Sequence, residues 1–343
     1  MKNFIFICSI LIILFKTGNV VSDNNIFNVN NIEISKDISK NKQKLANLAF
    51  QEGFKELTSR LLLEEDYKRI SATNLIEIKK LISYYQIKND ENNSNISFNL
   101  FFDRDRIHNF FYQRNILYSD IINTNIIVFP LLIKDKQNFI YTKNYFYENW
   151  NNEDSKESIQ YTLPVESVES IQKIKMNKEN IYKLNIQDFF KEYNLENMAF
   201  IAIEIEDNSA KVFLNSKIEG KKLNKNLLIN NTNLRENQFN DKIILEIKNV
   251  LKDLIKSQNL IDVRTPSFLN VEIKLNSKDN LVEFNNRLKK IDLIDNFYVQ
   301  QLNKDFVLVK IKYLGKINKI IKKLKDQNID LKMKDGQWKI NII

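Results

Sequence analysis

The stretch Phe-Leu-Asn-Val-Glu-Ile-Lys-Leu at residues 268–275 has the clearest strand pattern in the chain. Its apolar residues alternate with polar ones, which is typical of a strand with one buried face and one exposed face. After it, apolar residues recur at helical spacing between Leu281 and Ile291. Together, the two patterns predict a strand followed by a helix that packs on the apolar face of the strand.

The rest of the C-terminal segment continues this alternation of strands and helices. Two strand patterns at about 293–302 and 305–313 are followed by a helix with apolar residues from Ile317 to Leu324. The chain then ends in a strand that contains a tight turn at Asp335-Gly336. The order βαββαβ predicts a ferredoxin-like domain over residues 263–343.

The middle of the chain, residues 120–262, has the pattern of an α/β domain. Residues 125–133 (NIIVFPLLI) form an almost continuous apolar run, which suits a strand buried on both faces, with a bulge or an edge at Pro130. We predict a loop or short helix in the weakly patterned segment after Trp150. Further predicted elements are a helix at 178–193, a hairpin at 200–218 and an amphipathic helix at 239–256.

Residues 23–119 predict a smaller α+β domain. An opening strand at 26–34 precedes a strong amphipathic helix at about 38–62. The acidic run Glu64-Glu65-Asp66 is interpreted as a charged connector. The remaining predictions are a helix at 73–83, a hairpin around the polar turn 89–95 and a helix at 104–115. The whole chain is therefore predicted to be an α+β protein of several small mixed units.

The first 22 residues predict export. Lys2 precedes an apolar run from Phe4 to Phe15, which has the length of a signal-peptide core and is too short to span a bilayer. The small residues before Ser22 predict cleavage after that position and a periplasmic location. The alternative is an uncleaved inner-membrane anchor. No later stretch approaches spanning length without charges, so we predict no stable transmembrane segment after cleavage.

Composition limits the chemistry that the protein can use. The chain has a net charge of +9, which falls to +7 when the signal segment is removed with two of its lysines. The basic residues alternate with acidic ones along the sequence, so we interpret them as a solvated surface and predict no nucleic-acid partner. The single cysteine, Cys8, lies in the signal segment, so disulfides contribute nothing to the mature chain.

No familiar catalytic or cofactor motif is present. The single histidine, His108, follows two aspartates, but nothing nearby supplies a nucleophile, so we interpret it as a structural residue. One histidine cannot build the common zinc sites, and Asn89–Asn93 lack the spacing of a calcium loop. The five glycines are isolated, which excludes a phosphate-binding loop. We therefore predict no catalytic residue, no metal and no cofactor.

An aromatic stretch between residues 139 and 150 is the best candidate for a contact surface. Aromatic side chains near lysines suit the binding of a peptide, a glycan or a partner protein. The alternative is that these side chains pack on the middle sheet. The candidate residues are Tyr141, Tyr145, Tyr147 and Trp150.

Several segments together resemble one family of exported bacterial proteins. They are FNVNNIEISKD (27–37), LANLAFQEGFKELTSRLL (45–62), LISYYQIKNDENNSNISFNLFFDRDRI (81–107), the run 125–133 and GQWKI (336–340). In this combination the chain resembles the proteins grouped as domain of unknown function 2066. That resemblance implies export, but no activity and no catalytic residue.

These observations favour a non-enzymatic envelope protein that binds or scaffolds other envelope proteins. One alternative is a hydrolase or transferase that uses carboxylates alone, which would need a pair of acids at a defined separation. A second alternative is peripheral binding to anionic membranes through the basic surface. The sequence leaves the process, the partner, the oligomeric state and the relative orientation of the domains open.

Overall fold

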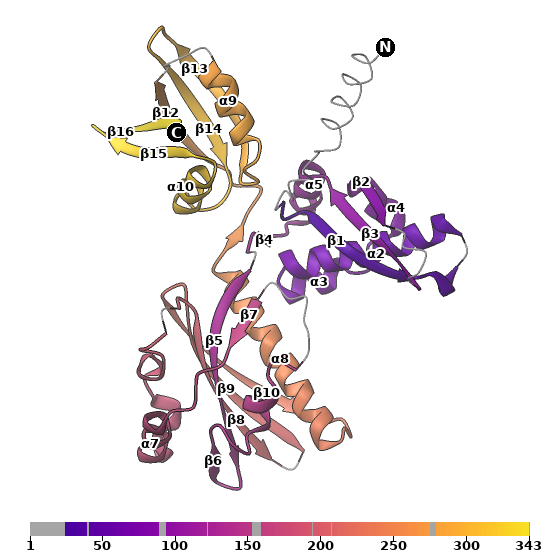
Figure 1. Cartoon of the computed structure of the whole chain (residues 1–343), viewed down its shortest axis with the longest axis vertical. Helices are drawn as coiled ribbons and strands as arrows, with labels where there is room; N and C mark the ends of the chain where they lie inside the picture. Colours follow the sequence, from indigo (N-terminus) through magenta and orange to yellow (C-terminus); the bar gives the residue numbers. More distant parts are fainter. Residues whose placement is uncertain are drawn as a thin grey trace, which may run out of the picture.

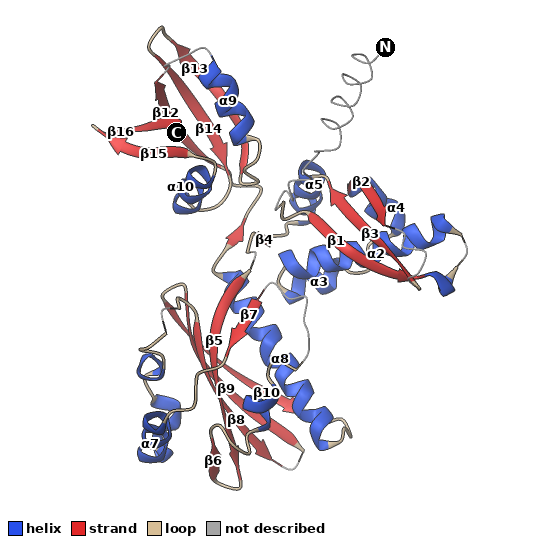
Figure 2. Cartoon of the chain, viewed as in Figure 1, coloured by secondary structure: helices blue, strands red, loops and turns tan. Residues whose placement is uncertain are grey.

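The computed structural model describes residues 25–342 apart from residues 40, 89–93, 122, 153–158, 194, 207 and 275–278. The predicted signal segment and the candidate calcium loop lie outside the described residues. The chain is a mixture of helices and sheets, as predicted, and its three larger sheets are separate in space (Figures 1 and 2).

The N-terminal part is an antiparallel sheet with helices on one face. The strand order is β1-β3-β2, and the strands are β1 (Asn28–Ser35), β2 (Ile82–Lys88) and β3 (Asn95–Phe102). The helical segments are η1 (Lys36–Ile38), α2 (Lys42–Leu61), α3 (Glu64–Ile70), α4 (Leu75–Leu81) and α5 (Arg104–Arg114). The predicted connector at 64–66 is instead the first turn of α3, where three acidic side chains suit the positive end of the helix dipole.

Helix α2 lies close to the sheet because of Gly53. A Cβ atom at this position would overlap the Leu100 side chain, which is fully buried on β3. In an exposed helix, replacing glycine by alanine stabilises by about 1 kcal/mol. Here we expect Gly53→Ala to lower the free energy of unfolding by about 1–2 kcal/mol, because overpacking exceeds that gain. Urea unfolding checks this, with Glu52→Ala on the exposed face as the control, and a stabilised Gly53→Ala protein would contradict it.

The middle part is a three-layer arrangement. Its sheet has the order β10-β9-β8-β5-β6, with β7 also paired to β5. The strands are β5 (Thr124–Lys134), β6 (Gln137–Phe139), β7 (Ile159–Thr162), β8 (Met198–Glu206), β9 (Ser209–Ile218) and β10 (Lys221–Asn230). The helices are α6 (Tyr145–Asn149), α7 (Val168–Met176) and α8 (Glu236–Ser257). Separate apolar clusters form on the two faces of the sheet, one with α8 and one with α7 and the segment after it.

Pro130 lies on β5 where that strand has a neighbour on one side only. It pairs with Ile201 of β8, while β7 pairs with β5 only as far as Ile127 and β6 pairs with β5 only from Leu132 onward. The missing N–H of proline is tolerated at such a local edge. No register shift, and hence no bulge, accompanies it in the β5–β8 ladder.

The predicted helix at 178–193 is wrong. The structure has two short 3₁₀ segments there, η2 (Lys178–Lys183) and η3 (Ile186–Phe189), and Asn180 inside η2 has non-helical backbone angles. Asn185 accepts a hydrogen bond from the N–H of Gln187 through its side chain. Asparagine side chains compete with the backbone for hydrogen bonds in this way, which breaks a regular helix into short turns.

The C-terminal part is a five-stranded sheet with two helices on one face. Its order is β13-β14-β12-β16-β15, and its elements are β12 (Ser267–Lys274), α9 (Asp279–Leu288), β13 (Ile294–Leu302), β14 (Phe306–Tyr313), α10 (Ile317–Asp326), β15 (Ile329–Lys334) and β16 (Gln337–Ile342). The predicted single final strand is a hairpin around Asp335-Gly336. Strand β16 inserts between β12 and β15 and runs parallel to β12, so the element order is βαββαββ and not the predicted βαββαβ.

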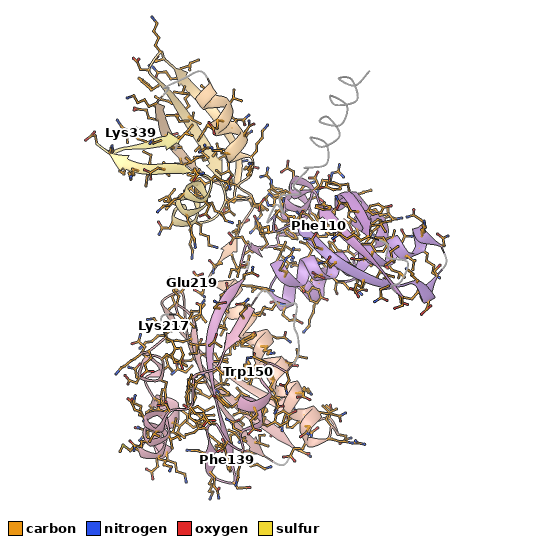
Figure 3. All side chains as sticks on the ribbon, in the orientation of Figure 1. Phe110, Phe139, Trp150, Lys217, Glu219 and Lys339 are labelled. Atoms are coloured by element: carbon orange, nitrogen blue, oxygen red, sulfur yellow. The ribbon has the colours of Figure 1, made fainter. Side chains whose placement is uncertain are left out.

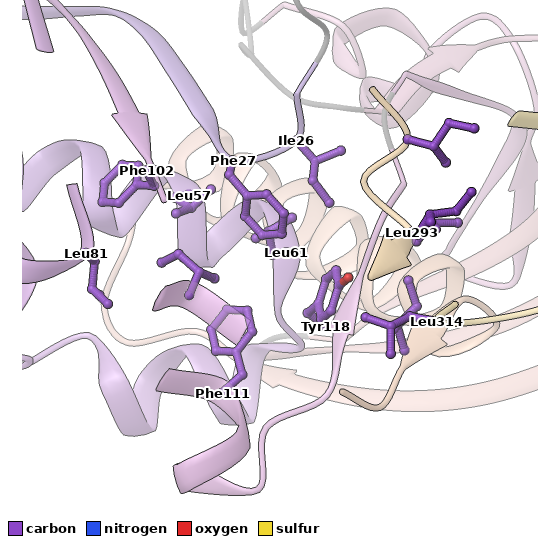
Figure 4. Close-up of a cluster of buried hydrophobic side chains, with 14 of the residues drawn as sticks. Ile26, Phe27, Leu57, Leu61, Leu81, Phe102, Phe111, Tyr118, Leu293 and Leu314 are labelled. Atoms are coloured by element: carbon purple, nitrogen blue, oxygen red, sulfur yellow. The ribbon is translucent and has the colours of Figure 1, made fainter. Parts of the chain in front are cut away.

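A two-stranded sheet joins these parts. β4 (Tyr118–Ser119) pairs antiparallel with β11 (Leu260–Ile261), so the chain enters and leaves the middle part at one place. The N-terminal and C-terminal parts share one apolar cluster, in which Ile26, Phe27 and Tyr118 lie near Leu293 and Leu314 (Figure 4).

The end of α8 is fixed against the N-terminal part by a buried lysine. The Lys256 Nζ donates to the backbone oxygens of Ser59, at 2.7 Å, and Leu62, which belong to the C-terminal end of α2. Burial lowers the pKa of Lys256 to about 7. One turn earlier, the Asp253 carboxylate accepts a hydrogen bond from the Glu64 N–H at the start of α3. Both ends of this α2–α3 turn are therefore held by polar groups of α8.

Candidate binding cavity

The aromatic stretch that we considered as a contact surface belongs mainly to the core. Trp150 is fully buried and Tyr141 is 4% exposed, while Tyr145 and Tyr147 are partly buried. Figure 3 shows Trp150 inside the middle part. The Asn144 side chain positions this segment by donating to the backbone oxygens of Pro130 and Ile140 and by accepting from the N–H of Phe146.

His108 is a packing residue at the junction with the C-terminal part. Its Nε2 lies 3.1 Å from the Tyr118 hydroxyl, and its ring meets Phe27 edge-on at 5.4 Å between centroids. Burial, followed by the nearby Arg104 cation, lowers the pKa of His108 to about 4. The contacts that the structure gives this ring are aromatic packing and one hydrogen bond, which fits a structural role.

The carboxylates at the end of β8 are in ordinary surroundings. The Glu204 carboxylate accepts a hydrogen bond from the Tyr182 hydroxyl, and Glu206 pairs with Lys211. Within the described part of the chain, no group of three or more histidine, cysteine or carboxylate residues could hold a metal ion. Among the same residues, no helix is both long enough and apolar enough to cross a membrane.

A polar cavity of about 630 Å³ lies on the face of the N-terminal sheet that α2 leaves open. It extends from the start of β1 across β3 and β2 to the first residues of α5. Six carboxamide side chains dominate its lining, namely Asn25, Asn28, Asn30, Asn31, Gln86 and Asn99. Carboxamides donate and accept hydrogen bonds at once, so this surface suits neutral polar groups such as the peptide unit.

Asn99 is the most informative residue of the cavity. Its side chain is 8% exposed, and its Oδ1 accepts a hydrogen bond from the Asn31 N–H at 2.9 Å. That bond holds the bulge in β1, where Asn31 has a left-handed backbone with φ of 59°. Its Nδ2 has no partner among the described residues. This amide group is not among the buried polar atoms that lack a partner, so it is open to solvent and available to donate to a bound ligand.

Two aromatic rings form an apolar platform beside the carboxamides. Tyr84 of β2 and Phe101 of β3 are directly opposite one another, and their rings stack with centroids 4.2 Å apart. The Tyr84 side chain remains 53% exposed. Such a platform can pack against an apolar side chain of a ligand while the amides bind its backbone.

The charged residues of the cavity are mostly occupied. Arg104 pairs with Asp105 and donates to the backbone oxygen of Ile294. Asp103 caps α5 by accepting from the Arg106 N–H and also pairs with the Arg106 side chain. Only Lys88 has no ionic partner among the residues described. The cavity therefore offers one unpaired cation and no unpaired carboxylate.

The two edges of this sheet differ in their protection. On the β1 side, the bulge interrupts the strand and the Arg60 guanidinium donates to the backbone oxygens of Ile26 and Asn28. Strand β2 has a register shift only at its start, between Ile82 and Tyr84, and pairs regularly with β3 from there to Lys88. Its residues from Ser83 to Lys88 are all exposed, and no side chain of the described residues donates to or accepts from their backbone. An edge of this kind is a template for pairing with another strand.

Sequence patterns could not have located this site. Its residues come from three separate segments, 25–31, 83–88 and 99–105, and asparagine is so frequent in the chain that no single one stands out. The one available signal is Tyr84-Tyr85, two large aromatics in succession on a strand, of which only one can face the core. Tyr85 packs on Phe50 of α2, which leaves Tyr84 on the open face.

No protein-family model matches the chain, and neither the search of curated proteins nor the search of solved structures found a match.

Proposed function

We propose that the chain is an exported, non-enzymatic envelope protein that binds another envelope protein through strand β2 and the adjoining carboxamide cavity. The observation that carries this proposal is the unprotected edge of β2 beside the free Nδ2 of Asn99. A partner strand on β2 would gain main-chain hydrogen bonds, and the cavity would select its side chains.

Location and organisation are part of the same proposal. We propose cleavage after Ser22 and a periplasmic location, with an uncleaved inner-membrane anchor as the alternative. The three parts, with boundaries near residues 119 and 262, are proposed to be domains. The last would be a ferredoxin-like variant with one added strand. The resemblance to domain of unknown function 2066 is compatible with these features.

The carboxylate-enzyme alternative is less well supported. It requires two acids that are free to exchange protons with a substrate. In the carboxamide cavity, Asp103 and Asp105 are engaged in a helix cap and in ion pairs. We therefore favour binding over catalysis at this site.

The proposal is tested by cross-linking in intact cells with a photoreactive residue in place of Gln86. We expect one recurrent protein adduct, and a mature N-terminus at Asp23. The variant Ile87→Lys places a charge on the pairing edge, so the adduct should fall by about tenfold or more. Ile87 is 42% exposed, so this change should leave the fold intact.

The matched control is Ile76→Lys. Ile76 lies on α4, is 72% exposed and is outside β2, so the same change in charge should leave the adduct unaltered. Equal loss in both variants, or no adduct from β2, would remove the basis of the proposal. Thermal unfolding of each purified variant shows whether the fold has been kept.

A further inference from the structure

The C-terminal sheet has one face that no helix covers. On β12 and β14 the residues Leu269, Val271, Val307 and Val309 are buried under α9 and α10. The alternate residues therefore lie on the opposite face. Cross-strand pairs confirm the shared face, because Phe268 lies opposite Lys312 and Asn270 lies opposite Lys310.

Folding gathers lysines on this open face that are dispersed in the sequence. Residues 263–343 contain 17 lysines and arginines against 9 acidic residues, and so carry +8 of the net +9 charge of the chain. Strand alternation places two acids, Glu272 and Asp330, on the open face, and a third, Asp295, reaches Lys312 from the irregular start of β13. It places six lysines there, namely Lys274, Lys310, Lys312, Lys332, Lys334 and Lys339.

Three of these lysines have nearby acids and three do not. Lys312 pairs with Asp295, Lys332 with Asp330 and Lys339 with Glu272, the last at 3.4 Å. Lys339 is labelled in Figure 3. The other three, Lys274, Lys310 and Lys334, have no acidic partner in the described part of the chain. The face therefore has an excess of positive charge that its own residues do not neutralise.

Two aromatic side chains stand on the same face. Phe268 is 51% exposed and Tyr298 is 48% exposed, on either side of β14. The Lys310 ammonium lies 4.4 Å from the centre of the Phe268 ring. Aromatic rings among lysines are typical of surfaces that meet lipid headgroups, where the rings lie at the interface and the ammonium groups contact phosphates.

We propose that this face binds the surface of an anionic lipid bilayer. The lysines would contact headgroup phosphates, and Phe268 and Tyr298 would enter the interfacial layer. A single-stranded nucleic acid is the competing polyanion, and it needs free aromatic faces for base stacking. Here Lys310 covers the Phe268 ring, and Tyr298 alone cannot stack successive bases. A lipid surface needs no such geometry, so the observations favour it.

The experiment measures binding to lipid vesicles. It uses the chain from Asp23 onward, which contains every described residue. The vesicles contain phosphatidylcholine with about 30% phosphatidylglycerol, or phosphatidylcholine alone. We expect binding only to the anionic vesicles, weakened by an increase in salt from about 0.05 M to about 0.5 M. The triple variant Lys274→Gln, Lys310→Gln, Lys334→Gln should bind roughly 100-fold more weakly, at about fivefold per lysine.

The matched control removes the same charge from the helical face. It is Lys290→Gln, Lys322→Gln, Lys325→Gln, three exposed positions just after α9 and on α10. It should keep most of the binding. Equal loss in the two triple variants would overturn the assignment to the sheet face. Binding to a single-stranded oligonucleotide but not to anionic vesicles would overturn the lipid proposal. The assay contains no partner protein, so its outcome is independent of the proposed role of β2.

Discussion

Replacing Trp150 by alanine is expected to lower the free energy of unfolding by about 3–5 kcal/mol, the range observed for buried large aromatic residues. The side chain is fully buried against the α8 face of the middle sheet. It meets Tyr161 edge-on, with ring centroids 6.1 Å apart. Truncation would remove all of these contacts and leave a cavity, because β5 and α8 cannot both collapse into the space. Urea unfolding followed by circular dichroism measures the change.

Two further variants make that result specific. Trp150→Phe keeps an aromatic ring and removes an indole N–H that has no hydrogen-bond partner among the described residues, so it should recover most of the stability. Tyr145→Ala removes a partly exposed ring whose hydroxyl donates to Asp241 at 2.8 Å, and should cost only about 1 kcal/mol. A fully folded Trp150→Ala protein of normal stability would restore Trp150 as a contact residue.

The second large effect is a loss of stability in acid that depends on His108. Burial lowers the pKa of His108 from 6.5 to about 4, so the unfolded chain binds a proton that the folded chain excludes between these values. Stability from this group is therefore complete above pH 6.5 and lost as the pH falls toward 4. The full shift corresponds to about 3 kcal/mol, which partial exposure of the ring reduces to about 2 kcal/mol.

His108→Gln isolates this contribution. Glutamine stays neutral and can still form a hydrogen bond with the Tyr118 hydroxyl, so the variant should be as stable as the parent at about pH 7. On acidification to about pH 4.5, its free energy of unfolding should fall by about 2 kcal/mol less than that of the parent. Carboxylates titrate in the same range in both proteins, and their effect cancels in the difference. His108 is the only histidine in the chain, so no second imidazole confuses the comparison. Identical pH profiles would show that the imidazole does not titrate differently on folding.

Most helices and strands could be predicted from the sequence because their apolar residues repeat with a clear period. Strand β12 and helix α8 are examples, and both lie within a few residues of the expected bounds. Strand β10 was missed because Lys221–Asn230 has mostly exposed side chains and so no buried face to detect. The final hairpin was predicted as one strand because nothing local shows that β16 pairs with β12, from which it is separated by two helices and three strands.

The candidate sites depended on relations between segments that the sequence does not reveal. The aromatic stretch near Trp150 suggested a surface, but Asn144 turns it inward by binding carbonyl groups of β5 and its own loop. The lysines of the C-terminal sheet appeared balanced by acids along the chain. Only strand alternation separates them, since acids such as Asp292, Asp305 and Asp326 lie outside the strands of the open face.

The pairing of β4 with β11 has a consequence for how such a chain could have arisen. Ser119 and Leu260 are cross-strand neighbours, so the middle part, which lies between them in the sequence, begins and ends at one place in the structure. A single recombination event could therefore add or delete the whole middle part without dividing the apolar cluster that the N-terminal and C-terminal parts share. The middle part therefore has the topology of an insertion, since the residues of the shared apolar cluster all lie outside residues 120–260.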